Sequence, residues 1–283
     1  GLFHQFDSTN VFKKNLCSII TSIHTDHLSW IKNKTIDGII HEKTTKLLNS
    51  SIFVSKQEND EILFKIKNSL KKNKSQKYFY GTDFNYLNAE NSFIHYEDFK
   101  GGLILPSPNI LGEHQLNNIS TAIIASRTLF NVTDANIKKA VTNINLKGRL
   151  QEINNGKLKK IAKKNRLIID CAHNLNGANS LAKWIKDTNQ NVHLILGMMK
   201  DKDHVNFVNS FKKNIKSLTL IDIPNNKGSI KKEEFKSKIK NQIQKIKISN
   251  SIENSIASNS SSKNQIILIT GSAYLAGEVL KLN

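Results

Sequence analysis

The residues best suited to chemistry lie in the stretch LIIDCAHNLNGA, residues 167–178. Apolar side chains surround a single carboxylate, Asp170, and the stretch becomes polar at His173. This pattern predicts a buried strand and a tight loop, followed by an amphipathic helix with Leu181 and Ile185 on its apolar side. In an α/β sheet such a loop lies at the carboxyl end of a strand, where ligands bind, and the helix N-terminus attracts anions. Asp170 and His173 are therefore candidate ligand-binding residues; the alternative is that Asp170 caps the turn and His173 packs locally.

Other short polar motifs lie next to apolar runs along the chain. In order, they are Asp7-Ser8-Thr9-Asn10, His24-Thr25-Asp26-His27, Glu42-Lys43, Gly112-Glu113-His114-Gln115, Gly148-Arg149-Leu150, Lys200-Asp201-Lys202-Asp203 and Thr270-Gly271-Ser272-Ala273-Tyr274-Leu275. The motif at residues 24–27 resembles half of a zinc site, but no cysteine or further histidine lies at ligand spacing. Each motif alone is a weak indication of a site, so the elements that position them matter.

The second half of the chain, from about Leu146, alternates between apolar strand-like runs and amphipathic helical runs. Strands are expected at 167–171, 192–196, 217–223 and 266–270, and helices at 177–187, 203–213, 231–246 and 273–281. This alternation predicts a mostly parallel sheet with right-handed crossovers. The segment 249–264 is rich in Ser and Asn and is expected to be the least ordered.

The first half is less regular. Strands are expected at 16–23 and 52–54, shorter β pieces within 78–105, and helices at 36–48, 59–70, 115–129 and 133–144. Thr133 or Asp134 is the expected cap of the last helix. We therefore expect two α/β domains, residues 1–145 and 146–283, with a cleft between them and a hinge near residues 146–149.

The net charge of +19, supplied mostly by lysine, makes nucleic-acid binding one alternative function. Against this alternative, the lysines are spread over the whole chain, and few aromatic residues interleave with the basic runs to stack on bases. We therefore expect small-molecule partners and no nucleic acid.

Membrane and secreted classes are disfavoured by the same sequence. No apolar run approaches the roughly 20 residues that span a bilayer, and the first residues, GLFHQFDSTN, lack the features of a signal peptide. Cys17 and Cys171 lie in apolar runs and are expected to be buried thiols in a reducing compartment. We expect a cytoplasmic protein with no membrane partner.

Taken together, the order and spacing of the motifs resemble the folylpolyglutamate synthase / dihydrofolate synthase branch of the Mur ligase superfamily. The family motifs read GLGGRLDATN, TSIxLDHxxWLG, EKAGI, GRHQxxNAxxA, GRLE, DGAHN, GMxxDKD and TGSLYLxGEV, and each has a counterpart here in the same order. The resemblance implies an α/β fold: part of a Mur-ligase central ATPase domain followed by a Rossmann-like C-terminal domain.

The resemblance implies that the protein is a ligase of folate biosynthesis and one-carbon metabolism. Such an enzyme uses ATP and Mg²⁺ to join L-glutamate to dihydropteroate or a folylpolyglutamate through an acyl phosphate. Its partners are these small molecules, and we expect a monomer.

The resemblance also implies roles for individual residues. Catalytic roles fall to Lys43 and His173, metal binding to His27, cofactor binding to Asn118, Arg149, Asp170 and His173, and substrate binding to Phe6, Asp7, Ser8, Asn174 and Ser272. Lys43 corresponds to the lysine that the family carbamoylates, which turns an ammonium into an anionic group facing the metal; the alternative is a surface lysine paired with Glu42. The amide of Asn118 suits an adenine edge, and the fork of Arg149 suits phosphate oxygens.

Some positions depart from the family pattern. Phe3, His4 and Gln5 replace Gly-Gly-Arg, and Cys171 replaces the glycine of DGAHN. The alternative within the family is therefore a divergent or inactive Mur-ligase homologue with another carboxylate substrate. The 283 residues contain no G-x-x-x-x-G-K-[ST] run, so we expect a C-terminal part of such an enzyme that is inactive by itself.

Overall fold

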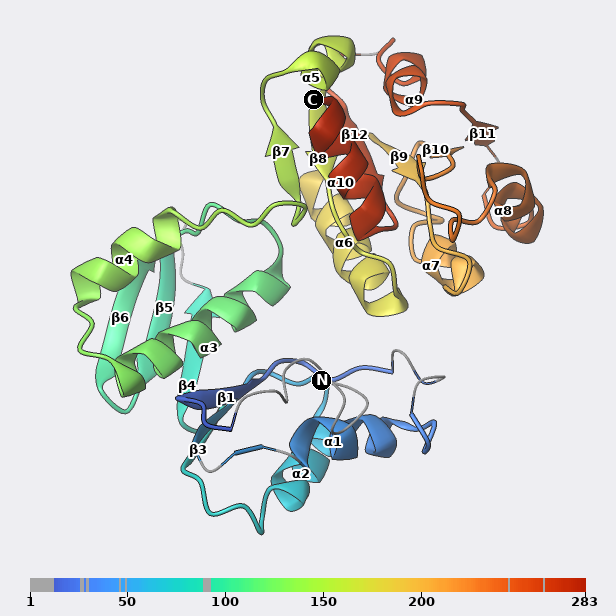
Figure 1. Ribbon diagram of the computed structural model, residues 1–283. Helices are drawn as coiled ribbons and strands as arrows, with labels where there is room; N and C mark the ends of the chain where they lie inside the picture. The colour runs from blue at the N-terminus through green and yellow to red at the C-terminus, as the bar shows by residue number, and fades with distance from the viewer. Residues whose placement is uncertain are drawn as a thin grey trace. The chain divides into compact units, whose positions relative to one another are not determined.

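The computed structural model describes residues 13–25, 28, 31–45, 47–48, 50–88, 93–243, 245–261 and 263–283 (Figure 1). The chain divides into two compact units. Unit 1 comprises residues 1–109 and 113–144, and unit 2 comprises residues 110–112 and 145–283. Among the described residues, none of the helices combines the length and the apolar character that a bilayer crossing requires.

Unit 2 is built around a six-stranded sheet with the strand order β11-β10-β9-β12-β8-β7 (Figure 1). The strands are β7 (Gln151–Ile153), β8 (Arg166–Ile169), β9 (Val192–Leu196), β10 (Ser217–Leu220), β11 (Ile246–Ile248) and β12 (Ile266–Thr270). Neighbouring strands are parallel except for β7 and β8, which pair antiparallel. The mostly parallel sheet predicted from the alternation is confirmed.

Helices cover both faces of this sheet, which makes unit 2 a three-layer, Rossmann-like α/β fold. They are α5 (Lys157–Ala162), α6 (Leu175–Thr188), α7 (His204–Asn209), α8 (Lys232–Ile239), α9 (Ile252–Ser258) and α10 (Ala273–Leu282). Successive side chains of a strand point to opposite faces, so β8 contributes Ile168 to one core and Leu167 and Ile169 to the other. The first core packs against α6, α7 and α8, and the second against α5, α9 and α10.

Among its described residues, unit 1 contains a parallel and an antiparallel sheet. The parallel sheet of β1 (Cys17–Ile20), β2 (Ser51–Val54) and β3 (Lys77–Phe79) shares a core with α1 (Ile36–Thr44) and α2 (Asp60–Ser69). The antiparallel sheet of β4 (Phe84–Asn88), β5 (Phe93–Asp98) and β6 (Gly101–Pro106) packs against α3 (Glu113–Leu129) and α4 (Asp134–Thr142). Thr133, one of the two predicted caps, is the N-cap of α4.

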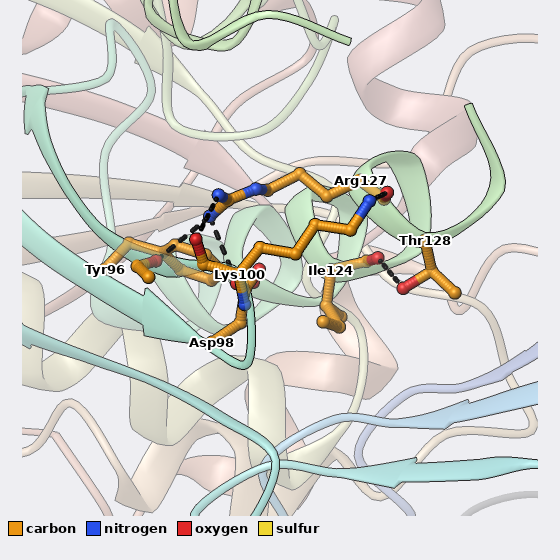
Figure 2. Close-up of polar contacts among 7 residues, drawn as sticks. Tyr96, Asp98, Lys100, Ile124, Arg127 and Thr128 are labelled. Atoms are coloured by element: carbon orange, nitrogen blue, oxygen red, sulfur yellow. Dashed lines mark hydrogen bonds and ion pairs between the residues drawn. The ribbon is translucent and has the colours of Figure 1, made fainter. Parts of the chain in front are cut away.

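A buried ion pair fastens the turn between β5 and β6 to the C-terminal end of α3 (Figure 2). Arg127 Nη1 lies 3.1 Å from Asp98 Oδ1, and the Asp98 side chain is 0% exposed. The Tyr96 hydroxyl and the Lys100 N–H donate to the same carboxylate at 2.9 and 2.8 Å. The guanidinium also donates to the carbonyls of Lys100 and Gly101. Burial, reinforced by the neighbouring carboxylate, raises the pKa of the Tyr96 phenol, so the phenol remains a donor.

Two predictions for residues 231–264 are wrong. The helix expected at 231–246 ends at Ile239, and residues 246–248 form β11, which pairs with β10. The segment 249–264, expected to be the least ordered, contains α9. Ser251 caps α9, and Ile252 and Ile256, which lie one turn apart, are buried in the second core. The Ser- and Asn-rich composition concealed this short amphipathic pattern.

A chain of buried polar side chains joins the amino-terminal ends of β9, β10 and β12. His193 Nδ1 lies 2.7 Å from Ser217 Oγ, and His193 Nε2 contacts Gln265 Oε1. Ser217 donates to Asn259 Oδ1 at 3.3 Å, and Asn259 donates to Thr219 Oγ1 at 3.1 Å. Because Asn259 follows α9 and Gln265 precedes β12, this network attaches the 259–265 connection to the sheet.

We expect unit 2 to lose stability as the pH falls from about 6.5 to about 5.5. Burial lowers the pKa of His193 and of His204 below the ordinary value of 6.5. Below that value the unfolded chain takes up protons that the folded unit does not. Each histidine therefore lowers the free energy of unfolding by up to about 1.4 kcal/mol per pH unit in this range.

Urea unfolding at several pH values measures this dependence, with Trp184 fluorescence followed in a Trp30→Phe background. The control variant His193→Gln lacks one of the two imidazoles and should show a shallower slope. A free energy of unfolding that stays constant or increases between pH 6.5 and 5.5 would contradict the expectation.

Candidate ligand site at the carboxyl edge of the unit 2 sheet

The carboxyl ends of β8 and β12 meet at a switch point of the unit 2 sheet. The two strands are parallel neighbours, but the chain leaves β8 for α6 on one face and leaves β12 for α10 on the other. In open α/β sheets, ligands bind where loops diverge to opposite faces in this manner. The loop of residues 170–174, singled out from the sequence, follows β8 at this edge.

Asp170 organises two segments at this edge through its carboxylate. The residue is 5% exposed. Its Oδ1 accepts the Ala172 N–H at 2.7 Å, which closes the turn after β8. Its Oδ2 accepts the N–H of Leu150 at 2.9 Å, across 20 positions of the sequence.

Arg149 lies between Gly148 and Leu150, whose backbones both have positive φ, 68° and 45°. The Cys171 N–H donates to the Gly148 carbonyl at 2.9 Å. A Cβ atom at Gly148 would lie 2.5 Å from Cys171 Sγ, so this close approach requires glycine. The Arg149 side chain is exposed. Burial and the charge of Asp170 raise the pKa of the Cys171 thiol, and the positive charge of Arg149 opposes that rise.

Other predicted residues of this edge make local contacts. His173 Nδ1 lies 3.0 Å from the Cys171 carbonyl oxygen; this contact assigns the proton of a neutral ring to Nδ1 and leaves a lone pair on Nε2. Asn174 is the N-cap of α6, and its Oδ1 accepts the Gly177 N–H at 2.9 Å. Ser272 is the N-cap of α10, and its Oγ accepts the N–H of the residue two positions later at 3.1 Å. Two of the five residues predicted for substrate binding, Asn174 and Ser272, therefore serve as helix caps.

The loop after β9 contributes a buried histidine that the sequence did not single out. Asp203 caps α7 by accepting the Asn206 N–H at 3.2 Å. His204 follows this cap, is buried, and donates from Nε2 to the Met199 carbonyl at 3.0 Å. Its position directly after a capping aspartate is the signal that could have found it, since side chains of the first helical turn lie close to the preceding loop.

Of the predicted site residues that the structure describes, two lie in unit 1. Lys43 is half-buried in the last turn of α1, where a cation favourably meets the helix dipole. Asn118 is exposed near the start of α3, and its Nδ2 donates to Gln115 Oε1 at 3.1 Å. The remaining predicted site residues lie outside the described residues; they are Phe6, Asp7, Ser8 and His27.

The groups at the unit 2 edge suit an anion better than a metal ion. The Arg149 guanidinium can donate to two oxygens at once, and the N-terminus of α6 favours negative charge. In the part of the chain that the structure describes, no cluster of three or more His, Cys, Asp or Glu side chains could hold a metal. For an anion that carries a bound metal ion, these groups suit the anion and not the metal.

Comparison with known proteins places these features in a family context. Residues 148–273 match the family described as Mur ligase, glutamate ligase domain. Over its whole length the chain is 27% identical to the dihydrofolate synthase/folylpolyglutamate synthase of Buchnera aphidicola subsp. Schizaphis graminum and covers 64% of that protein. It is 25% identical to the protein of the same name from Bacillus subtilis, with 99% of this chain and 65% of the relative covered. The chain thus spans slightly less than two thirds of the length of these relatives.

Solved structures show the same fold. E. coli FolC in complex with DHPP and ADP aligns with a TM-score of 0.81 and 22% identity over 99% of this chain and 64% of its own. The bifunctional folylpolyglutamate synthase/dihydrofolate synthase of Yersinia pestis, complexed with AMPPNP and Mn ion, aligns with a TM-score of 0.82 and 19% identity, with the same shares covered. The α/β architecture of each unit is therefore shared with these proteins.

Proposed function

Because the chain belongs to the folylpolyglutamate synthase / dihydrofolate synthase branch of the Mur ligase superfamily, we propose that it takes part in ATP-dependent ligation of L-glutamate to a pteroate or folate carboxylate. In this reaction the carboxylate attacks the γ-phosphate and becomes an acyl phosphate while ADP leaves. The amine of L-glutamate then attacks the acyl carbon, forms the amide bond and releases phosphate. Positioned donors and cations contribute most of the catalysis of phosphoryl transfer.

The observation that carries this proposal is the placement of Arg149. The residue lies within the segment 148–273 that matches the glutamate ligase domain, and its exposed guanidinium is carried on a turn that is hydrogen-bonded to the loop after β8. An arginine fork binds phosphate oxygens in pairs. We assign to Arg149 the binding of the ATP phosphates. His173 is assigned to the phosphate side of the site, where its Nε2 would accept a hydrogen bond or carry a proton.

The resemblance also assigns roles to residues of unit 1, and we propose these roles for each residue by itself. The exposed amide of Asn118 suits the donor and acceptor of an adenine edge. Half-buried Lys43, once carbamoylated, would present an anionic group toward Mg²⁺, and His27 is the proposed metal ligand. When bound, ATP and Mg²⁺ supply the phosphoryl group and the charge that neutralises it. The binding of the pteroate or folate substrate is assigned to Phe6, Asp7 and Ser8.

A divergent relative that uses another carboxylate acceptor is the second candidate function. The observation that favours it is Cys171, whose Sγ fills the space beside Gly148 at a position where the family motif has glycine. A bulkier residue beside the phosphate-facing turn alters the shape of the site. The choice of acceptor in an activity assay separates the two candidates.

Replacing Arg149 by alanine is expected to lower kcat/KM for glutamate incorporation by about 10²- to 10³-fold, because a donor that stabilises transition-state charge is lost. The assay uses a hybrid in which the segment that precedes the matched region of the Bacillus subtilis relative is joined to Gly1, because the family resemblance implies that this segment carries a P-loop. Labelled L-glutamate is supplied with ATP and either dihydropteroate or tetrahydrofolate.

Lys147→Ala, which removes an exposed cation two residues away, is the matched control and should leave kcat/KM nearly unchanged. An equal loss in both variants would assign the effect to net charge instead of to Arg149. A hybrid that binds ATP but glutamylates neither acceptor would favour the divergent relative.

A further inference from the structure

The antiparallel sheet of unit 1 has one face that α3 and α4 do not cover. Side chains alternate along β5 between buried and exposed positions, and the exposed ones are Phe93, His95 and Glu97. On the neighbouring strands Leu87 and Ile104 are 65% and 56% exposed. The outward face of the sheet therefore presents large apolar side chains to solvent, around a histidine and a carboxylate.

The strand register arranges this face around a hollow. Directly paired residues form two rows across the three strands, which are Leu87–His95–Ile104 and Asn85–Glu97–Gly102. Because Gly102 has no side chain, the second row has a gap beside Glu97. The two rows line a hollow of about 220 Å³. Pockets for drug-sized ligands are larger, roughly 300–1,000 Å³, so this hollow suits a single side chain or a molecule of similar size.

The charge on this face differs from that of the chain as a whole. The sequence has 42 Lys and Arg against 23 Asp and Glu, yet no outward-facing position in the described parts of β4, β5 and β6 is Lys or Arg. Lys100, in the β5–β6 turn, donates from Nζ to the Arg127 carbonyl on the α3 side of the sheet (Figure 2). Among the described residues, no side chain pairs with the Glu97 carboxylate. The hollow therefore favours a cation.

The groups around the hollow suit a primary ammonium on an aliphatic stem. The ammonium would donate to the Glu97 carboxylate and to the acceptor nitrogen of a neutral His95 ring. The stem would lie along Leu87 and Ile104, as lysine stems do on apolar surfaces, in the space beside Gly102. A metal ion fits less well, because the described residues form no cluster of three or more His, Cys, Asp or Glu side chains that could hold one.

We propose that this hollow binds a lysine side chain presented by a partner protein. A protein is favoured over a free amine by Phe93, which is 47% exposed on the same face but lies outside the hollow. Only residues that flank the bound lysine would cover this ring. The cores of protein interfaces are likewise poor in lysine and rich in aromatic residues. The inference goes beyond the proposed function and does not depend on it.

Titration of the peptide acetyl-Leu-Lys-Leu-amide into the ¹⁵N-labelled full chain tests the proposal. It is followed by NMR at low ionic strength, because salt screens exposed charges. We expect the amide signals of β5 and β6 near Glu97 and Gly102 to shift, with a dissociation constant on the order of 1 mM. The same peptide with norleucine in place of lysine lacks the ammonium and should bind about threefold more weakly or worse.

Two variants of the chain separate the charge from the space. Glu97→Gln should weaken binding of the lysine peptide by about threefold or more. Gly102→Val should weaken it by about tenfold or more, because the added side chain excludes the stem from its apolar contacts. A Cβ atom at Gly102 would meet only the Tyr96 carbonyl oxygen, at an ordinary 3.7 Å. Asp187→Asn removes the same charge from an exposed position on α6 and should leave binding unchanged.

Equal affinity for the lysine and norleucine peptides, or equal affinity of the unaltered chain and Glu97→Gln, would overturn the recognition of an ammonium. Shifts confined to other parts of the chain would overturn the site. If n-butylammonium binds as tightly as the lysine peptide, the flanking residues contribute nothing and the protein source is overturned. If Gly102→Val loses the dispersed amide signals of unit 1, it has unfolded, and Glu97→Gln decides the question.

Discussion

When the 283-residue chain is assayed by itself, its rate of L-glutamate incorporation into dihydropteroate or tetrahydrofolate is expected to be at least about a thousandfold below that of the hybrid. Phosphoryl transfer requires that the triphosphate and Mg²⁺ be held together, and positioning supplies nearly all of its catalysis. The residues proposed here bind the adenine and one side of the phosphates. The glycine-rich loop and lysine that cradle the triphosphate in P-loop enzymes have no counterpart in these 283 residues.

The measurement is ATP-dependent incorporation of labelled glutamate by the purified chain and by the hybrid at equal concentration. Hydrogen exchange of unit 2 in the same preparation shows whether an inactive sample is folded. Ligase activity from the chain alone, abolished by Arg149→Ala, would show that a P-loop is dispensable and that the phosphates are bound differently.

Asp98→Ala is expected to destabilise unit 1 by about 3–5 kcal/mol, the usual cost of removing one partner from a buried ion pair. The substitution leaves the Arg127 guanidinium, whose side chain is 10% exposed, without its carboxylate. It also removes the acceptor of the Tyr96 hydroxyl and of the Lys100 N–H. The β5–β6 turn should then detach from the end of α3 before the rest of the sheet unfolds.

Chemical unfolding followed by hydrogen exchange at β5 and β6 measures this loss, and exchange at β12 reports on unit 2 in the same sample. Glu97→Ala is the matched control, since this neighbouring acidic residue of β5 is exposed and its removal should cost within about 0.5 kcal/mol. Equal protection of β5 in the two variants would mean that the ion pair contributes little to the stability of unit 1.

Local sequence patterns were enough to predict those features of unit 2 that depend on residues close together in the chain. The alternation of apolar and amphipathic runs predicted β8, β9, β10 and β12 and the helices that follow them. It also placed the loop of residues 170–174 at the end of a strand. Such features are visible because strand burial and helix periodicity are encoded within a few residues. Motif order likewise indicated the family before any fold was known.

The tertiary structure alone decided which of these elements became neighbours. β12, the last strand of the chain, lies between β8 and β9, and this insertion creates the switch point. The helix predicted at 231–246 from local composition was too long. Residues 246–248 instead form β11, which pairs with β10 at the edge of the sheet. The bond from Asp170 to Leu150 spans 20 positions and forms because β7 folds back antiparallel on β8. No local pattern specifies such a contact, because its acceptor and donor meet only after the sheet has brought their strands together.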